Sequence, residues 1–189
     1  METQKRKRKR IYPENKDMGN IAIVDEIAFV QNCASPNARK VVSIDETFQI
    51  DIWEDKHYHL REQHGDTNGK REGIEPKKTQ EIIKEALKHL IFYSGVVKNF
   101  SFLNYKLPLG SRALRILCQK IYDGNTTNVI IEGRVIGLNC FEITVFTALQ
   151  KNDFEPSDGQ YVLELLGNEN SILSHYTKRF NKLNEICSI

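Results

Sequence analysis

The most restrictive feature of the sequence is an alternating apolar segment, NVIIEGRVIGLNCFEITVFTAL, at residues 128–149. Its first half is rich in Ile and Val, and a short stretch with Gly and Asn follows. Its second half places Phe141, Ile143 and Val145 at every other position. A period of two residues directs alternate side chains to opposite faces of a strand. The segment therefore predicts two antiparallel strands joined by a turn.

A second pattern, with apolar residues every three or four positions, predicts helices at three places. In the clearest of them, residues 75–95, apolar pairs recur every four residues from Ile82 to Ile91. Pro76 suits the first turn of this helix, and Gly95 suits its C-terminal end. Apolar stripes typical of helices also occur in residues 20–33 (NIAIVDEIAFVQNC) and residues 171–186 (SILSHYTKRFNKLNEI), although the β-branched residues of the first segment also allow a strand.

Shorter extended runs complete the predicted fold. Residues 40–53 are interpreted as two strands, because Phe and Ile alternate with polar residues in the second run, and residues 159–165 as another. Residues 112–122 fit either a helix or a strand. Together these segments predict an α+β fold with helices packed on a small, mainly antiparallel β-sheet. We expect one such domain over residues 16–189.

The positive charge of the chain is concentrated near the N-terminus, in the run KRKRKR at residues 5–10. Without these six residues, 21 Lys and Arg face 25 Asp and Glu, a net charge of −4. We expect residues 1–15 to form a basic disordered tail. Such a tail holds polyanions by salt-sensitive contacts, serves as a nuclear import signal in a eukaryotic host, or only adds solubility.

Several common classes of protein lack support in the sequence. The four cysteines lie far apart without a CxxC pair, which argues against a zinc ribbon or a disulfide framework. The loop and helix motifs that bind nucleotides or zinc are missing, so we expect no metal and no cofactor. No apolar run approaches the roughly 20 residues of a membrane-spanning helix. No signal peptide is recognisable either, and a cytoplasmic protein without membrane partners is predicted.

One cluster of polar residues, HYHLREQHGD at residues 57–66, is a candidate catalytic site. Its candidate residues are His59, Arg61 and His64. A strand would place His57, His59 and Arg61 on one face, and a helix would instead align His57, Arg61 and His64, so charge converges in either geometry. Metal binding is disfavoured because the fixed charge of Arg61 repels a dication. A histidine beside a guanidinium suits proton transfer at a phosphate group. The structural alternative is a set of surface histidines at the end of an element.

A basic segment in the second half of the chain is a candidate nucleic-acid surface. Residues 98–134 carry six basic residues against Asp123 and Glu132. Cationic side chains on one segment suit contacts to phosphate groups, although each is more often a solvated surface charge. The candidates for such contacts are Arg112, Arg115, Lys120 and Arg134.

The order of three motifs, HLREQHG, GIEPKKTQEIIKEAL and FEITVFTAL, resembles the phage-associated branch of the barnase, EndoU, colicin and RelE-like ribonuclease superfamily. The resemblance covers about residues 55–155. It implies a small α+β fold in which helices precede an antiparallel sheet and RNA is cut without metal. It also implies catalytic roles for His59, Arg61 and His64 and for a strand hydroxyl. The candidates for that hydroxyl are Thr144 and Thr147. The spacing REQH, where adjacent Arg and His are more typical, leaves open whether His59 or His64 is the equivalent histidine.

The function expected from these features is that of a toxin-like, metal-independent endoribonuclease. A histidine would take the proton of the 2′-hydroxyl, Arg61 would hold the phosphate, and a threonine hydroxyl would donate to it. RNA, with tRNA as one candidate, is the expected partner, together with an immunity protein. The alternatives are a nucleic-acid-binding protein without catalysis and a phage-borne inhibitor that acts by protein contact.

Overall fold

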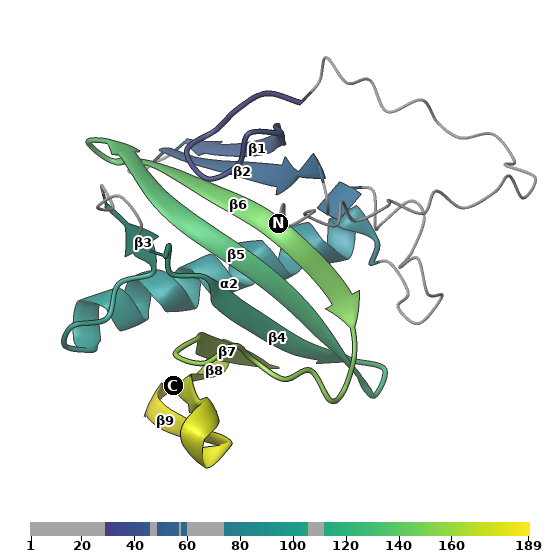
Figure 1. Cartoon of the computed structure of the whole chain (residues 1–189), viewed down its shortest axis with the longest axis vertical. Coiled ribbons are helices and arrows are strands. Elements are labelled where there is room, and N and C mark those ends of the chain that lie inside the picture. Colours follow the sequence, from purple (N-terminus) through teal and green to yellow (C-terminus); the bar gives the residue numbers. More distant parts are fainter. Residues whose placement is uncertain (1–28, 46–48, 57, 60–73, 106–111) are drawn as a thin grey trace, which may run out of the picture.

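Within the residues that it describes, the computed structural model shows a nine-stranded mixed β-sheet with one long helix across one face (Figure 1). The described residues are 29–45, 49–56, 58–59, 74–105 and 112–189. The strand order is β1-β2-β6-β5-β4-β7-β8-β9, and β3 pairs with the end of β5. The elements are β1 (Ala38–Asp45), β2 (Gln49–Asp55), α2 (Pro76–Val96), β3 (Leu103–Asn104), β4 (Ile116–Tyr122), β5 (Asn125–Gly137), β6 (Cys140–Gln150), β7 (Tyr161–Gly167), β8 (Asn170–Thr177), a 3-10 turn (Lys178–Phe180) and β9 (Lys182–Ser188).

The antiparallel pair predicted at residues 128–149 is confirmed as β5 and β6, which form the centre of the sheet. The predicted strands at β1, β2 and β7 are confirmed as well. Of residues 112–122, for which helix and strand were both open, residues 116–122 form β4. The helix predicted at residues 75–95 is confirmed as α2, although Gly95 lies inside its last turn and Val97 caps it.

The predicted fold class, helices packed on a small and mainly antiparallel sheet, is wrong. The sheet of the described residues has nine strands, and three of its pairings, β2–β6, β3–β5 and β4–β7, are parallel. The edge of a strand offers a row of N–H and C=O groups that a further strand satisfies. Strands distant in the chain therefore extend the central pair on both sides.

The predicted helix at residues 171–186 is also wrong, because this segment forms β8, a short 3-10 turn and β9. β8 pairs with β7, and β9 folds back onto β8. Asn181 adopts a left-handed backbone conformation at the reversal, with φ of 44°, which Asn tolerates better than most residues. The apolar residues of this segment fit both the helical period of 3.6 residues and the strand period of two residues. Pairing with β7 stabilises the strand form.

The helix predicted at residues 20–33 is absent from the part that is described. Val30 instead forms an isolated bridge with Ala38, with backbone N to O distances of 2.8 Å in both directions. The backbone groups of Val30 are thus satisfied by the start of β1 and not by a helical turn. Residues 20–28, and the basic tail predicted at residues 1–15, lie outside the described residues.

The apolar stripe of α2 packs against one face of the sheet, and no helix of the described residues covers the other face (Figure 1). Stripe and sheet share one hydrophobic cluster that includes Ile82, Ala86, Leu90 and Tyr93 of α2 and Ile52, Ile131, Ile143, Val145 and Leu163 of the strands. Because side chains alternate along a strand, Glu132 and Arg134 point away from Ile131 and from α2. We call the face that carries them the open face.

A buried hydrogen-bonded network connects α2 to β8. The hydroxyl of Ser171 lies 3.0 Å from Nδ1 of His89 and 2.9 Å from the hydroxyl of Tyr93. All three side chains are buried. Burial lowers the pKa of the His89 imidazole, and the carboxylates of Glu85 and Glu169 offset only part of this effect. The network therefore holds the C-terminal hairpin on the helix with His89 neutral.

This network makes stability depend on pH. Because the pKa of His89 in the folded state lies below its ordinary value of 6.5, the unfolded chain takes up the proton first on acidification. The contribution of His89 is complete above about pH 6.5 and is lost as the pH falls toward the folded-state pKa. We expect urea unfolding of the wild type at pH 7, 6 and 5 to show a falling free energy of unfolding, and a smaller fall in His89→Gln. An unchanged pH dependence in the variant would contradict this role.

Candidate functional site

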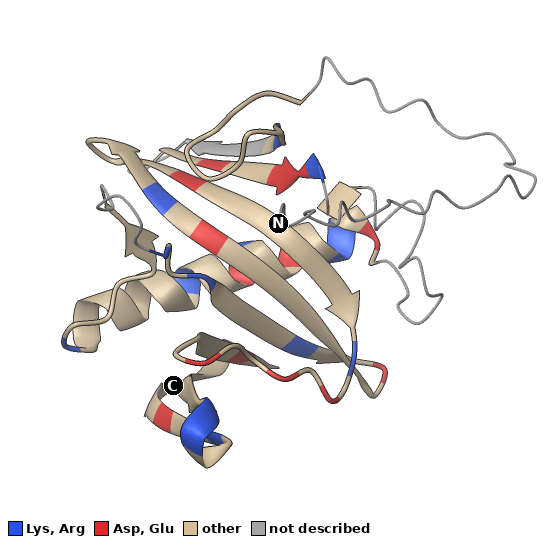
Figure 2. Ribbon diagram, viewed as in Figure 1, with Lys and Arg blue, Asp and Glu red and all other residues tan. Residues whose placement is uncertain are grey.

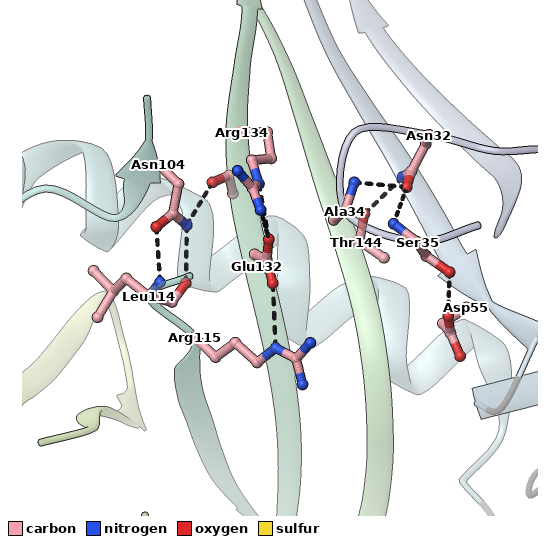
Figure 3. Close-up of polar contacts among 11 residues, drawn as sticks. Asn32, Ala34, Ser35, Asp55, Asn104, Leu114, Arg115, Glu132, Arg134 and Thr144 are labelled. Atoms are coloured by element: carbon pink, nitrogen blue, oxygen red, sulfur yellow. Dashed lines mark hydrogen bonds and ion pairs between the residues drawn. The ribbon is translucent and has the colours of Figure 1, made fainter. Parts of the chain in front are cut away.

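The open face carries a buried carboxylate held between two guanidinium groups (Figure 3). Glu132 of β5 is only 2% exposed. Its Oε2 accepts a hydrogen bond from Nε of Arg115 at 3.2 Å, and its Oε1 lies 2.8 Å from both Nε and Nη2 of Arg134. Glu132 and Arg134 are two residues apart on one strand, and Arg115 directly precedes β4, whose Ile116 pairs with Ile131. Two neighbouring strands thus bring the three side chains together.

Phe146 of β6 completes this cluster from the other side. The guanidinium carbon of Arg115 lies 3.7 Å above the centre of the Phe146 ring. This cation–π contact and the bond to Glu132 hold the guanidinium in one place, although 48% of the Arg115 side chain is exposed. One carboxylate and two guanidinium groups leave the cluster with a net positive charge. It is therefore suited to an anion that approaches from solvent.

Asn104 fixes the position of Arg115 through the backbone. Its Oδ1 accepts a hydrogen bond from Leu114 N at 2.7 Å, and its Nδ2 donates to Leu114 O and Gly133 O, both at 2.9 Å. The amide of one buried side chain thereby connects the start of β4 to β5. A groove of about 830 Å³ opens beside this connection and is lined by Asn104, Arg112, Leu114, Arg115, Asp158 and Gln160.

Charged residues continue across the open face from the cluster toward β1, as Figure 2 shows for β5, β6 and β2. Lys40 pairs with Asp51 at 2.7 Å. Asp51 is the cross-strand partner of Glu142, and Glu142 is the partner of Arg134. Two acidic residues, Asp51 and Glu142, therefore lie side by side on these strands, between Lys40 and Arg134. The arrangement makes the open face a charged surface in which Asp51 and Glu142 are largely buried.

The two threonines predicted as hydroxyl donors both lie on β6. Thr144 is fully buried, and its hydroxyl accepts a hydrogen bond from Nδ2 of Asn32 at 2.7 Å. Asn32 Oδ1 in turn accepts from the backbone N–H groups of Ala34 and Ser35. Thr144 thus holds the segment before β1 on the open face (Figure 3). Thr147 is 9% exposed and lies at the irregularity where β5 and β6 change register.

The structure describes only part of the predicted histidine and arginine cluster. His59 is buried just after β2, and its ring centre lies 5.7 Å from that of Phe29. Burial lowers the pKa of His59, Arg39 lowers it further, and Glu54 acts in the opposite sense. Arg61 and His64 fall in residues 60–73, outside the described residues. Their convergence with His59 therefore stays a prediction.

The four basic residues predicted to contact nucleic acid occupy three different environments. Arg115 and Arg134 belong to the cluster around Glu132, and Arg112 lines the adjoining groove. Lys120 instead points to the helix side of the sheet, where its ammonium pairs with Glu85 of α2. Although burial alone would lower the pKa of Lys120, the hydrogen bond and charge of Glu85 outweigh this and raise it. Lys120 thus joins the helix to the sheet.

Sequence reasoning missed the central residue of the site. In the sequence, Glu132 was noted only as one of two acidic residues in the basic segment at residues 98–134. The signal that points to it is the spacing of Glu132 and Arg134 in the predicted strand, which places opposite charges on one face. Phe146 and Asn104 had no comparable signal, because their roles depend on contacts with other strands.

No protein-family model, curated protein or solved structure matches the chain. The described residues include no group of three or more His, Cys, Asp or Glu side chains arranged to hold a metal ion. Among the helices of the same residues, none is both long and apolar enough to cross a bilayer.

Proposed function

We propose that the chain is a metal-independent endoribonuclease whose reacting groups are Glu132, Arg115 and Arg134. The observation that carries the proposal is the buried carboxylate of Glu132 between two guanidinium groups, on the open face and beside a groove. The reaction type is the one that the sequence resemblance implies. The role of base passes from a histidine to Glu132. His59 and His64 remain candidates for the proton donor, and Arg61 remains a candidate for holding the phosphate.

The chemistry is an attack by a ribose 2′-oxygen on the neighbouring phosphorus. The O2′–P bond forms and the P–O5′ bond breaks, which leaves a 2′,3′-cyclic phosphate on one fragment and a 5′-hydroxyl on the other. Glu132 takes the proton of the 2′-hydroxyl, and an acid of the protein gives a proton to the leaving O5′. Arg115 and Arg134 stabilise the charge that builds up on the nonbridging phosphate oxygens.

Competition for the guanidinium groups supports this division of roles. Guanidinium binds phosphate through the same paired N–H donors that it offers to a carboxylate. A phosphodiester that engages Arg115 and Arg134 takes over their bonds to Glu132. The carboxylate is then left beside the substrate without its ionic partners and is available to accept a proton.

RNA is accordingly the proposed partner, with tRNA as one candidate substrate and an immunity-type protein as a second partner. We place the activity in the cytoplasm, or in the nucleus of a eukaryotic host through the basic run at residues 5–10. The net positive charge of the Glu132 cluster supports an anionic substrate. Binding without cleavage is the outcome that would favour the non-catalytic alternatives.

The proposal predicts RNA cleavage in the presence of EDTA. The purified chain is incubated with total tRNA, with ribosome-bound messages and with a single-stranded oligonucleotide that exists in ribose and 2′-deoxyribose forms. We expect fragments that end in 2′,3′-cyclic phosphate from the ribose substrates, because the 2′-oxygen is the nucleophile, and an intact deoxyribose form. Mass spectrometry of the fragment ends measures this directly.

Fragments with 5′-phosphate ends, or cleavage that EDTA abolishes, would reject the mechanism. RNA binding without cleavage of any of these substrates would reject the enzyme and leave a nucleic-acid-binding protein.

A further inference from the structure

The groove beside the Glu132 cluster has room for a whole nucleotide. Its volume of about 830 Å³ lies within the range of about 300–1,000 Å³ that small-molecule sites span. Apolar side chains of Ala113, Leu114 and Ile130 form part of its wall. The flat face of a nucleobase packs well against such a wall. Arg115 belongs both to this groove and to the Glu132 cluster, so a ligand in the groove reaches the proposed reacting groups.

Two arginines of the groove have N–H groups left for phosphate. Arg115 uses only Nε for Glu132, and its two terminal nitrogens have no hydrogen-bond partner within the described part of the chain. Arg112 is exposed and forms no ion pair with a described acidic residue. Guanidinium groups with unused donors bind phosphate. The groove therefore offers one guanidinium group to each of the two phosphates that flank a nucleotide.

Asp158 supplies the opposite chemistry. Among the described residues that line the groove it is the only acidic one. Its Oδ1 accepts a hydrogen bond from the backbone N–H of Lys178 at 2.8 Å, which fixes the carboxylate. The residue is exposed, and no described basic side chain pairs with it, so Oδ2 is left for a ligand. A carboxylate only accepts hydrogen bonds, and the ligand must therefore bring a donor.

The donor that distinguishes the bases of RNA is the exocyclic amino group. Adenine, cytosine and guanine carry one, whereas uracil has only carbonyl oxygens outside its ring. Asp and Glu side chains accept from the N4 amino group of cytosine in nucleic-acid complexes. The O4 oxygen of uracil would instead face Asp158 as a second acceptor. The edge of a base is accessible in this way when the base is unpaired.

We propose that the groove binds the unpaired nucleotide next to the cleaved bond, and that Asp158 selects a base with an amino group over uracil. Arg115 and Arg112 hold the two phosphates of this nucleotide. The inference rests on the proposed function, which places the reacting phosphate at Arg115. It names the substrate class as single-stranded RNA with adenosine, cytidine or guanosine at this position.

Two short oligonucleotides that differ in one base test the selection. Each has three 2′-deoxyribose units, and only the central unit carries a base, cytosine in one and uracil in the other. Neither has a 2′-hydroxyl, so neither is cleaved. Both are titrated into the full-length chain and followed by amide chemical shifts in NMR spectra. We expect the cytosine form to bind on the order of 10-fold more tightly, the scale of one good base contact. Arg112→Ala should weaken both forms by the same factor, because it removes a phosphate contact.

Two aspartate variants locate the selection. Asp158→Asn keeps an oxygen for the N–H of Lys178 and adds an amide donor that suits a carbonyl oxygen, so the preference for cytosine should disappear or turn toward uracil. Asp153→Asn is the matched control. Asp153 lies in the same β6–β7 connection and pairs with Lys151 at 3.5 Å, but it does not line the groove. Its substitution should leave the preference unchanged.

Equal affinity of the wild type for the two forms would overturn the proposal, as would a preference that survives Asp158→Asn or is lost equally in Asp153→Asn. No saturable binding of either form up to about 10 mM would overturn it as well. The cleavage assay separates this inference from the proposed function. RNA cleaved equally well at cytidine and uridine would reject the subsite and keep the ribonuclease. A cytosine preference in binding, without cleavage of any RNA, would keep the subsite and reject the enzyme.

Discussion

Replacing Glu132 by Gln is expected to lower the rate of RNA cleavage about 10³-fold, within the usual range for loss of a general base. Gln keeps the shape of the side chain and one oxygen that accepts from Arg134, but it cannot take a proton. Binding of the deoxyribose oligonucleotide should be preserved or strengthened, because a phosphate no longer competes with a carboxylate for the two guanidinium groups. Single-turnover cleavage rates and fluorescence anisotropy measure the two quantities separately.

The matched control is Glu85→Gln. Glu85 also pairs with a basic residue, Lys120, but does so on the helix side of the sheet. Its removal is expected to affect stability slightly and the cleavage rate by less than about twofold, as for a surface ion pair away from the reacting atoms. A similar loss of cleavage in Glu85→Gln and Glu132→Gln, both folded by circular dichroism, would show a structural effect and reject Glu132 as the base. Full activity of Glu132→Gln would reject it as well.

Adding a single methyl group at Gly133 is expected to destabilise the protein by about 1–3 kcal/mol, the usual scale for overpacking a core. A Cβ at this position would lie 2.9 Å from the carbonyl oxygen of Phe102, 3.1 Å from Leu103 Cδ2 and 3.3 Å from Ile143 Cδ1. The closest of these atoms belongs to the backbone just before β3, so a rotamer change cannot relieve the clash. β3 must move, and Asn104 moves with it.

Gly95→Ala is the matched substitution with the opposite expected sign. A Cβ at Gly95 meets nothing within 4 Å, and the residue lies in the last turn of α2. Replacing Gly by Ala in a helix stabilises it by about 0.5–1 kcal/mol, because the unfolded chain loses freedom. Urea unfolding of both variants at pH 7 measures the two changes. Destabilisation by Gly95→Ala, or a neutral Gly133→Ala, would contradict the packing described for these positions.

Only part of the candidate site was predictable from the sequence. Arg115 and Arg134 were predicted to meet nucleic acid because they are basic residues in a basic segment. Their meeting around Glu132 depends on the register between β4 and β5, which no local pattern specifies. Thr144 was predicted to donate a hydrogen bond to a phosphate. Its hydrogen bond with Asn32 was not predictable from the sequence, because 112 positions separate the two residues.

The fold, like the site, was predictable from the sequence only in part. The sequence by itself determined the local elements with a clear period: the β5–β6 pair, the α2 stripe and the short strands β1, β2 and β7. Their periodicity records which side chains become buried, and this information is contained in neighbouring residues. The tertiary structure alone decided that residues 171–186 form strands, that three pairings are parallel and that Glu132 lies between two arginines. The hydrogen bonds and ion pairs responsible for these features join residues far apart in the chain, and their free energy exceeds local preferences that are weak for segments fitting both periods.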